Sequence, residues 1–297
     1  MKNALAFSVT IALGILPKVS FADHFKPEKS EIRSKGNLAH TDLRNINLSG
    51  ANLIRTYFFK ANLSGANLSG ANLNNANLNG SILNFASLFK SNLNNANFNK
   101  ANLFRADLTN SEMAKLNLKK VNLSQATLIG ANLFRTTLIE ANLKGAILKR
   151  ANFFSANLSF SKLIDADLRG ANLYQANLSR ANLIGAKLSD AILVNTNFRN
   201  AKLFNADLKR SDIRGSILNN ADLRQSDLRE SNLRSANLIK TNLRGSDLRG
   251  SILNNADLSN ADLRSAKLQD IKALNLIGCP SYLPKGWSCE NKQILEN

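Results

Sequence analysis

The sequence predicts an all-β solenoid, in which the chain winds around a central axis and each turn stacks on the one before it. Every fifth residue from Leu38 to Leu268 is large and apolar, through 47 successive positions. The residue two before each of these is nearly always Ala, Ser or Thr, and the residue one before is usually Asn or Asp. A fixed period over most of a chain takes precedence over local propensity in predicting the fold.

A period of five residues fits neither a helix nor a strand. An α-helix advances about 100° per residue, so successive leucines would lie roughly 140° apart around it. On a strand the leucines would alternate between the two faces. A chain that turns one corner in every five residues can point all of them at one axis, with the small residues leaving room there. Because ordering costs about 1–2 kcal/mol per residue, one coil is unstable alone, and coils must stack about 4.8 Å apart.

The repeated motif Ala-Asn/Asp-Leu-x-x, as in Ala66–Gly70, resembles that of the pentapeptide-repeat family over about residues 36–270. The resemblance implies a right-handed quadrilateral β-helix with four repeats per coil, and therefore about twelve coils with small N- and C-terminal caps. It also implies that the leucine and the small residue two before it point inward, while the other three point outward. We therefore expect the β-helix to span residues 37–270.

A few inward small positions carry a larger side chain. Ile46, Leu116 and Val121 replace the usual Ala, Ser or Thr. Side chains of this size crowd a narrow axis, and overpacking displaces the backbone. We therefore expect a locally widened or distorted coil around residues 111–125.

Residues 1–22 precede the repeats and have the pattern of a secretory signal peptide. A mostly apolar run follows Lys2, and small residues flank the expected cleavage after Ala22. The alternative is an uncleaved membrane anchor, but the run is shorter than the ~20 residues that span a bilayer. We expect an exported protein that is periplasmic or extracellular, or in the thylakoid lumen if the organism is photosynthetic. Residues 23–36 are polar and are expected to be an N-terminal cap or a disordered segment.

The five-residue repeat ends before residues 271–297, which we expect to form a C-terminal cap. This segment contains both cysteines of the chain, Cys279 and Cys289. In an exported protein an isolated pair at this spacing predicts a disulfide, the alternative being two free thiols. The stretch Leu283–Trp287 resembles a Leu-Pro-x-Gly-Trp tail that follows the last coil in many bacterial members of the family. We expect Trp287 to cover the end of the leucine column.

With four repeats per coil, residues twenty apart stack on one wall of the rod. One wall carries, directly after the leucine, a set of side chains that we call the aromatic strip: Phe134, Phe154, Tyr174 and Val194. Such a strip indicates a partner-docking surface, because soluble proteins seldom expose large contiguous apolar patches. The alternative is a side-chain ladder that only stabilises the solenoid.

Two other walls are basic in part. One carries a set that we call the basic ladder: Lys149, Arg169, Lys209, Arg229 and Arg249. Asp and Arg two apart on a strand share a face, so the Asp-Leu-Arg copies are expected to form solvated, ion-paired walls. The alternative is an anion-binding surface. The wall opposite the aromatic strip changes from apolar to basic along the rod: Ile164, Ile184 and Phe204, then Arg224, Arg244 and Arg264.

The composition provides few side chains suited to catalysis. The chain has two histidines, and its many serines and threonines occupy repeat positions. General acid–base catalysis and metal binding usually draw on histidine and on converging carboxylates. The five-residue repeat is uninterrupted between residues 38 and 268, so no insertion there could hold an active-site loop. We therefore expect no enzyme activity, no cofactor, no metal and no small-molecule substrate.

The charge of the chain disfavours one function that the resemblance suggests. Known members of the family protect DNA gyrase by imitating DNA, which requires an acidic rod. This chain has 39 basic and 21 acidic residues and a net charge of +18. A basic protein favours polyanions instead, although we expect no specific nucleic acid.

We therefore predict a non-enzymatic exported scaffold, or a protein-interaction rod, with an unknown protein partner. The alternative is binding to an anionic envelope component or another polyanion through the basic faces. An open rod end would also allow a homodimer, because unpaired edges of a sheet invite pairing with another chain.

Overall fold

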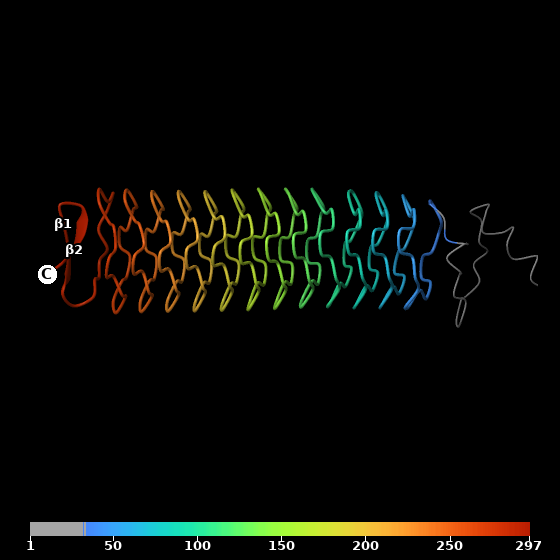
Figure 1. Ribbon diagram of the computed structural model, residues 1–297, viewed down its shortest axis with the longest axis horizontal. Coiled ribbons are helices and arrows are strands. Elements are labelled where there is room, and N and C mark those ends of the chain that lie inside the picture. Colours follow the sequence, from blue (N-terminus) through green and yellow to red (C-terminus); the bar gives the residue numbers. More distant parts are fainter. Residues whose placement is uncertain (1–31, 33) are drawn as a thin grey trace, which may run out of the picture.

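The computed structural model describes residue 32 and residues 34–297, which form one rod of stacked coils (Figure 1). Parallel bridges join residues twenty apart, from Asn37 with Tyr57 to Ile252 with Lys272. Four five-residue repeats therefore complete each coil. The predicted signal segment 1–22 and most of the predicted segment 23–36 lie outside the described residues. Among the residues described, no helix is long and apolar enough to cross a bilayer.

Each corner of a coil is a tight turn with a left-handed residue. The N–H of Ala61 donates to the carbonyl of Phe58 at 3.0 Å, and Lys60 between them has a φ of 55°. This is the pattern of a type II turn, which requires a positive φ at its second central residue. Glycine takes this place without strain, as at Gly70. The N–H of the left-handed residue also bonds to the next coil, as from Gly70 to Phe89 at 2.7 Å and from Lys60 to Asn79 at 2.9 Å.

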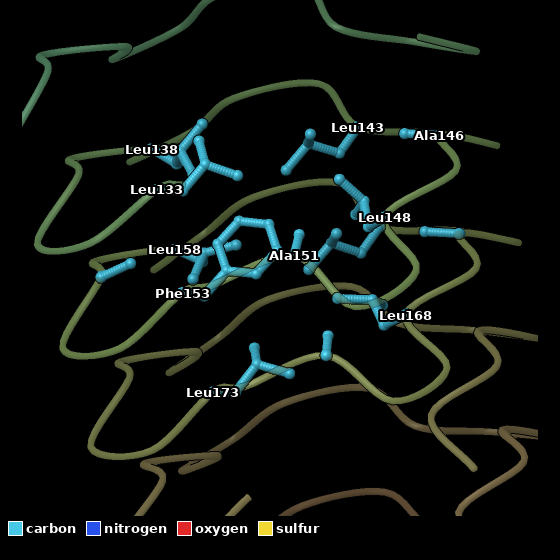
Figure 2. Close-up of a cluster of buried hydrophobic side chains, with 14 of the residues drawn as sticks. Leu133, Leu138, Leu143, Ala146, Leu148, Ala151, Phe153, Leu158, Leu168 and Leu173 are labelled. Atoms are coloured by element: carbon cyan, nitrogen blue, oxygen red, sulfur yellow. The ribbon is translucent and has the colours of Figure 1, made fainter. Parts of the chain in front are cut away.

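The inward side chains form one continuous core along the axis. Every large inward residue from Leu43 to Leu268 is at most 2 % exposed, and all belong to a single cluster. Figure 2 shows part of this cluster, with Leu133, Phe153 and Leu173 following one another along one wall. The small inward residues are buried with them, and buried hydroxyls there bond to the backbone, as from Ser81 to the Leu78 carbonyl at 2.6 Å, with Ser251 as an exception. The predicted interior column is confirmed.

The predicted distortion appears as a gap in the backbone ladder. In the described rod the series of coil-to-coil bridges skips one pair, Asn97 with Asn117. Leu116 and Val121 lie buried beside the inward Phe98, so the extra volume holds the two coils apart at this wall. Within the described residues, several backbone donors there lack the coil-to-coil bond that their counterparts on either side make: Asn95, Phe98, Lys100, Asn117 and Asn122.

The solenoid continues past the predicted boundary at residue 270. Asp257 still pairs with Gly278, at a spacing of twenty-one residues, and Asp262 pairs with Tyr282. A Cβ on Gly278 would lie 1.9 Å from the Ser259 hydroxyl oxygen, so glycine is required for this close approach. The predicted C-terminal cap is therefore a final partial coil followed by a hairpin.

The hairpin consists of the two regular strands of the described chain. Strand β1 spans Trp287–Glu290 and β2 spans Gln293–Glu296, and they pair antiparallel at the end of the rod (Figure 1). Elsewhere in the described chain the coils are joined by single-residue bridges, because each straight side is only about three residues long between corners.

The core predicts a sharp contrast between two neighbouring substitutions. Leu168→Ala should lower the free energy of unfolding by about 2–5 kcal/mol, because Leu168 is fully buried in a closed core. Arg169→Ala should change it little, because Arg169 lies on the outer wall. Denaturant unfolding of both variants measures the contrast. Similar losses at the two sites would contradict the inward and outward assignment.

The gap in the ladder predicts fast amide exchange at one place in the rod. Phe98 and Lys100 should exchange their amide protons faster than Leu138 and Glu140, which occupy the same positions two coils later. The later pair donates to Asn157 at 2.6 Å and to Ser159 at 3.0 Å, and such bonds slow exchange. Native-state hydrogen exchange measures this, and equal protection of both pairs would contradict the gap.

Candidate functional site

The aromatic strip lies on one outer wall as a continuous stack. The ring centroids of Phe134 and Phe154 are 5.5 Å apart, and those of Phe154 and Tyr174 are 5.2 Å apart with nearly parallel rings. Val194 follows in the next coil, and all four side chains are half-buried. The guanidinium carbon of Arg135 lies 5.0 Å from the Phe134 ring. The strip therefore stabilises its own wall and still presents apolar surface to solvent.

A row of amide side chains runs beside the strip and fixes its polar edge. The side-chain amide of Asn172 donates to Asn152 at 3.4 Å, and that of Asn152 donates to Asn132 at 3.2 Å. Asn132 in turn donates to a carboxylate oxygen of Glu112 at 2.8 Å. These bonds hold one edge of the aromatic strip in a single geometry along the rod.

The basic ladder is stacked as predicted, but its charges are paired. Each member lies within 4 Å of a carboxylate: Lys149 with Asp167 at 3.5 Å, Arg169 with Asp167 at 2.7 Å, Lys209 with Glu230 at 3.3 Å, Arg229 with Asp227 at 2.5 Å and Arg249 with Asp247 at 2.6 Å. Lys209 reaches across to another coil, whereas each arginine binds the aspartate of its own repeat. The expected ion pairs of the Asp-Leu-Arg copies are confirmed, and they make this wall nearly neutral.

The arginines hold their aspartates in the ionised form. In Asp222, Asp247 and Asp262 the arginine hydrogen bond lowers the carboxyl pKa and outweighs burial, which acts in the opposite direction. In Asp167 and Asp227 burial is the largest single influence and raises the pKa, but the hydrogen bonds and the charge of the arginine together lower it. These carboxyls therefore remain charged to a lower pH than a free aspartate does.

An asparagine in place of the aspartate leaves the arginine unpaired. Asn242 accepts only the backbone N–H of Arg244, at 3.2 Å, and no carboxylate of the described chain lies within 4.0 Å of the Arg244 guanidinium. Arg234 follows Asn232 in the same way. Sequence analysis missed this distinction, although one residue carries the signal: Asp or Asn directly before the inward leucine.

A shallow recess opens on the wall opposite the aromatic strip. Its volume is about 370 Å³, and it is lined by Phe204, Arg224, Gln225, Arg244, Gly245 and Ser265. The missing side chain at Gly245 leaves the space beside Arg244. In the described part of the chain, no group of His, Cys, Asp or Glu is arranged to hold a metal ion. The lining side chains can bind an anion, and they include no histidine or carboxylate.

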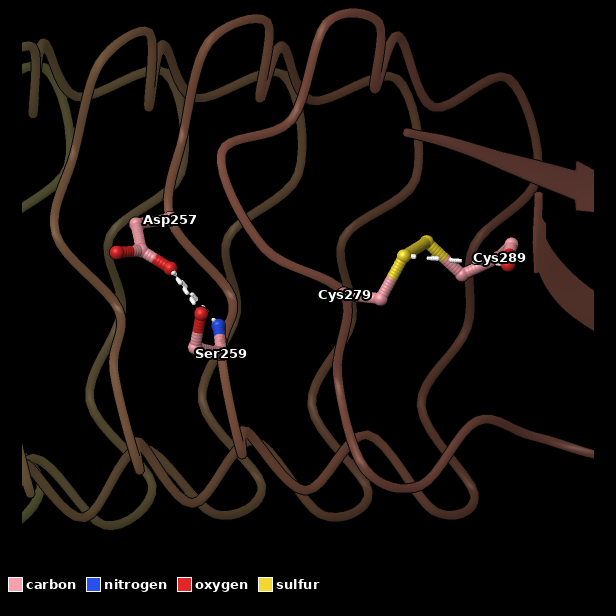
Figure 3. The surroundings of a disulfide bond; sticks show 4 residues. All are labelled: Asp257, Ser259, Cys279 and Cys289. Carbon is pink, nitrogen blue, oxygen red and sulfur yellow. Dashed lines mark hydrogen bonds between the residues drawn. A yellow bond between two sulfur atoms is a disulfide. The ribbon is translucent and has the colours of Figure 1, made fainter. Parts of the chain in front are cut away.

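The end of the rod is held by the predicted disulfide. Cys279 of the last partial coil is bonded to Cys289 of β1, with a Cα–Cα distance of 6.0 Å (Figure 3). Trp287 is partly buried and packs against the core cluster. Ile294 of β2 enters the core more fully, at 6 % exposed, and its N–H donates to Ala273 at 3.3 Å. The burial of Ile294 was not predicted. The sequence indicates it only by placing a β-branched residue in a mostly polar tail.

These features define a class of protein, a solenoid of five-residue repeats with a closed core and solvated walls. The protein belongs to the pentapeptide-repeat family. The model of that family, described as "Pentapeptide repeats (8 copies)", matches over seven ranges: residues 37–75, 71–110, 117–153, 151–190, 181–220, 216–255 and 242–272. Members of this family are generally non-enzymatic scaffolds or interaction proteins.

Solved structures of other pentapeptide-repeat proteins resemble the chain. HetL, involved in heterocyst differentiation regulation in the cyanobacterium Nostoc sp. strain PCC 7120, is 30% identical over 75% of this chain and 90% of that chain, with a TM-score of 0.26. A protein from the Arabidopsis thaliana thylakoid lumen is 36% identical over 37% of this chain and 69% of that chain, with a TM-score of 0.27. Full-length QnrB1, a plasmid-mediated fluoroquinolone resistance protein, is 18% identical over 78% of this chain and 90% of that chain, with a TM-score of 0.28. No curated protein matches the sequence.

The Asp-Leu-Arg pairs predict a loss of stability in acid. Their aspartate pKa is lower in the folded protein than in the unfolded chain, where it is about 4. The pairs therefore stabilise the fold above about pH 4, and this contribution is lost as the pH falls through the lower folded-state pKa. A variant with Asp222, Asp247 and Asp262 all changed to Asn should melt at a lower temperature than the natural protein at pH 7.

The two melting curves should converge as the pH falls below the lowered folded-state pKa, because protonation then removes the same charges from the natural protein. Asparagine is a close control, since it still accepts the backbone N–H as it does in the Asn-Leu-Arg copies. A difference in melting temperature that stays constant from pH 7 to the acid limit would show that the pairs contribute nothing.

Proposed function

We propose that the protein is an exported, non-enzymatic rod that holds protein partners on its outer walls, with the aromatic strip as the docking site. The observation that carries the proposal is the stack of Phe134, Phe154 and Tyr174, which remains half-exposed on a fixed wall. Aromatic side chains are enriched at protein interfaces because they bury much area at little entropic cost.

The geometry of the rod favours docking through side chains. In the coils around the strip, backbone groups are already bonded from coil to coil, as from Phe153 to Asn172 at 2.7 Å. A partner therefore gains little by adding a strand, and must use side chains that complement the ridge of rings. We propose an apolar partner surface with hydrogen-bonding groups at its edge, to match the amides of Asn132, Asn152 and Asn172.

Export is supported by the chemistry of the C-terminal end. The Cys279–Cys289 disulfide fits an oxidising compartment, because such bonds are rare where thiols are kept reduced. The signal-like segment 1–22 points the same way. The protein would then act in the periplasm, outside the cell, or in the thylakoid lumen of a photosynthetic organism.

The test replaces Phe134, Phe154 and Tyr174 together by Ser. Partners captured by the natural protein from its own envelope fraction at physiological salt are identified, and binding is repeated with purified components. We expect the triple variant to lose at least about tenfold in affinity, because a few buried aromatics dominate most interfaces.

The matched control changes the same position on the opposite wall, with Ile164, Ile184 and Phe204 replaced by Ser. Both variants must first show a cooperative thermal unfolding transition, since each also loses packing on its wall. If the strip variant binds as tightly as the natural protein, or if the control loses as much affinity, the strip is not the docking site.

A further inference from the structure

The wall opposite the aromatic strip carries positive charge that no carboxylate of the described chain pairs. We call four of its residues the basic wall: Lys144, Lys162, Lys202 and Arg244. All four side chains are exposed, and within the described residues none has a carboxylate within 4.0 Å. The basic wall thus differs from the basic ladder, in which every cation is paired.

The nearest carboxylates on this wall are already engaged. Asp222 binds Arg224 and Asp262 binds Arg264, each through the Nε and Nη2 atoms of the guanidinium. Lys202 and Arg244 act on these two aspartates only as more distant charges. Asp165 stands at the corner of the wall and is exposed. The positive charge of the basic wall is therefore available to a ligand.

Apolar and amide groups lie between the cations. Ile164, Ile184 and Phe204 occupy successive coils between Lys144 and the arginines, and all three are half-buried. Stacked in the neighbouring rank with Lys162 and Lys202 are three amides: Asn142, Asn182 and Asn242. A linear ligand along the rod axis would meet cations, amides and apolar surface in turn, in steps of one coil.

The recess beside Arg244 adds a site for one residue of such a ligand. Its volume of about 370 Å³ lies at the lower end of the range for small-molecule pockets. Phe204 contributes apolar atoms to the lining, Gln225 and Ser265 supply hydrogen-bonding groups, and Arg244 supplies a guanidinium with no carboxylate partner in the described chain. This combination suits a sugar ring that carries a carboxylate, since a guanidinium binds a carboxylate with two parallel bonds.

Two other polyanions fit the basic wall less well. Single-stranded nucleic acid needs free aromatic faces for its bases, but Arg180, Arg224 and Arg264 cover the rings of Phe160, Phe204 and Tyr282 at 5.3, 5.7 and 4.5 Å. An acidic peptide that binds as an added strand needs unpaired backbone groups at a sheet edge, and the backbone of this wall is already bonded from coil to coil, as from Leu183 to Lys202 at 2.7 Å.

We propose that the basic wall binds a linear acidic polysaccharide with uronate residues, laid along the rod axis with one carboxylate in the recess beside Arg244. This goes beyond the proposed protein docking and uses the opposite wall. A uronate polymer brings a carboxylate on each acidic sugar, hydroxyls for the amides and C–H faces for the isoleucines. It needs neither a free aromatic face nor a free strand edge.

The test measures binding of a defined oligogalacturonate to the purified protein by calorimetry, at low and at physiological salt. The variant changes Lys162, Lys202 and Arg244 to Gln. The matched control changes Arg169, Arg229 and Arg249 to Gln, which removes the same formal charge from paired positions. We expect the basic-wall variant to lose about tenfold or more in affinity, and its salt slope to fall by about two. The control should bind within about twofold of the natural protein.

Several outcomes would overturn the proposal. Equal losses in the two variants would mean that only net charge matters, and no loss in either would place the ligand elsewhere. Tighter binding of polyglutamate, or of single-stranded DNA with the same number of charges, would assign the wall to that class of polymer. Absence of binding to all three probes would also overturn it. The strip variant with Phe134, Phe154 and Tyr174 changed to Ser should keep oligogalacturonate binding, so the two proposals fail separately.

Discussion

Backbone hydrogen bonds between successive coils are the interaction on which the rest of this structure depends. Nearly every inward leucine donates its N–H to a carbonyl nineteen residues later, as from Leu168 to Lys187 at 2.7 Å. This bond is possible only if coils are about one strand spacing apart, which in turn requires a small residue beside each leucine at the axis. The core and the backbone ladder therefore set the same five-residue period, and a side chain that is too large at the axis opens the ladder, as beside Leu116.

The inward side chains fill the core, and the backbone groups bond from coil to coil. Only the outward positions are therefore free to vary. The residue directly before the leucine decides the character of a wall, since an aspartate neutralises the arginine two places later and an asparagine does not. Asp247 binds Arg249 at 2.6 Å, whereas Arg244 after Asn242 has no carboxylate partner in the described part of the chain. Both side chains accept the same backbone N–H, so the exchange alters surface charge without altering the turn.

The two proposed surfaces follow from this separation of core and wall. The aromatic strip and the basic wall lie on opposite sides of the rod, because their repeats are ten residues apart in a coil of twenty. Each is built by repetition, with equivalent atoms recurring at every coil. A rod of this kind presents a linear array of side chains at equal spacing. Such an array suits an extended ligand or a long interface better than a compact substrate.

Sequence alone determined the period, the inward and outward positions, the cysteine pair and the place where Leu116 and Val121 distort a coil, because each depends on residue size or spacing along the chain. It also predicted which side chains stack, since a coil of twenty residues aligns Phe134 with Phe154. Tertiary structure decided which charges are neutralised, because Lys209 pairs with Glu230 of another coil while Arg244 has no carboxylate within 4.0 Å among the described residues. It also decided how the rod ends, with Ile294 inserted into the core and the last coil extended to Tyr282. Side-chain reach and end packing depend on distances through space, and no repeat encodes them.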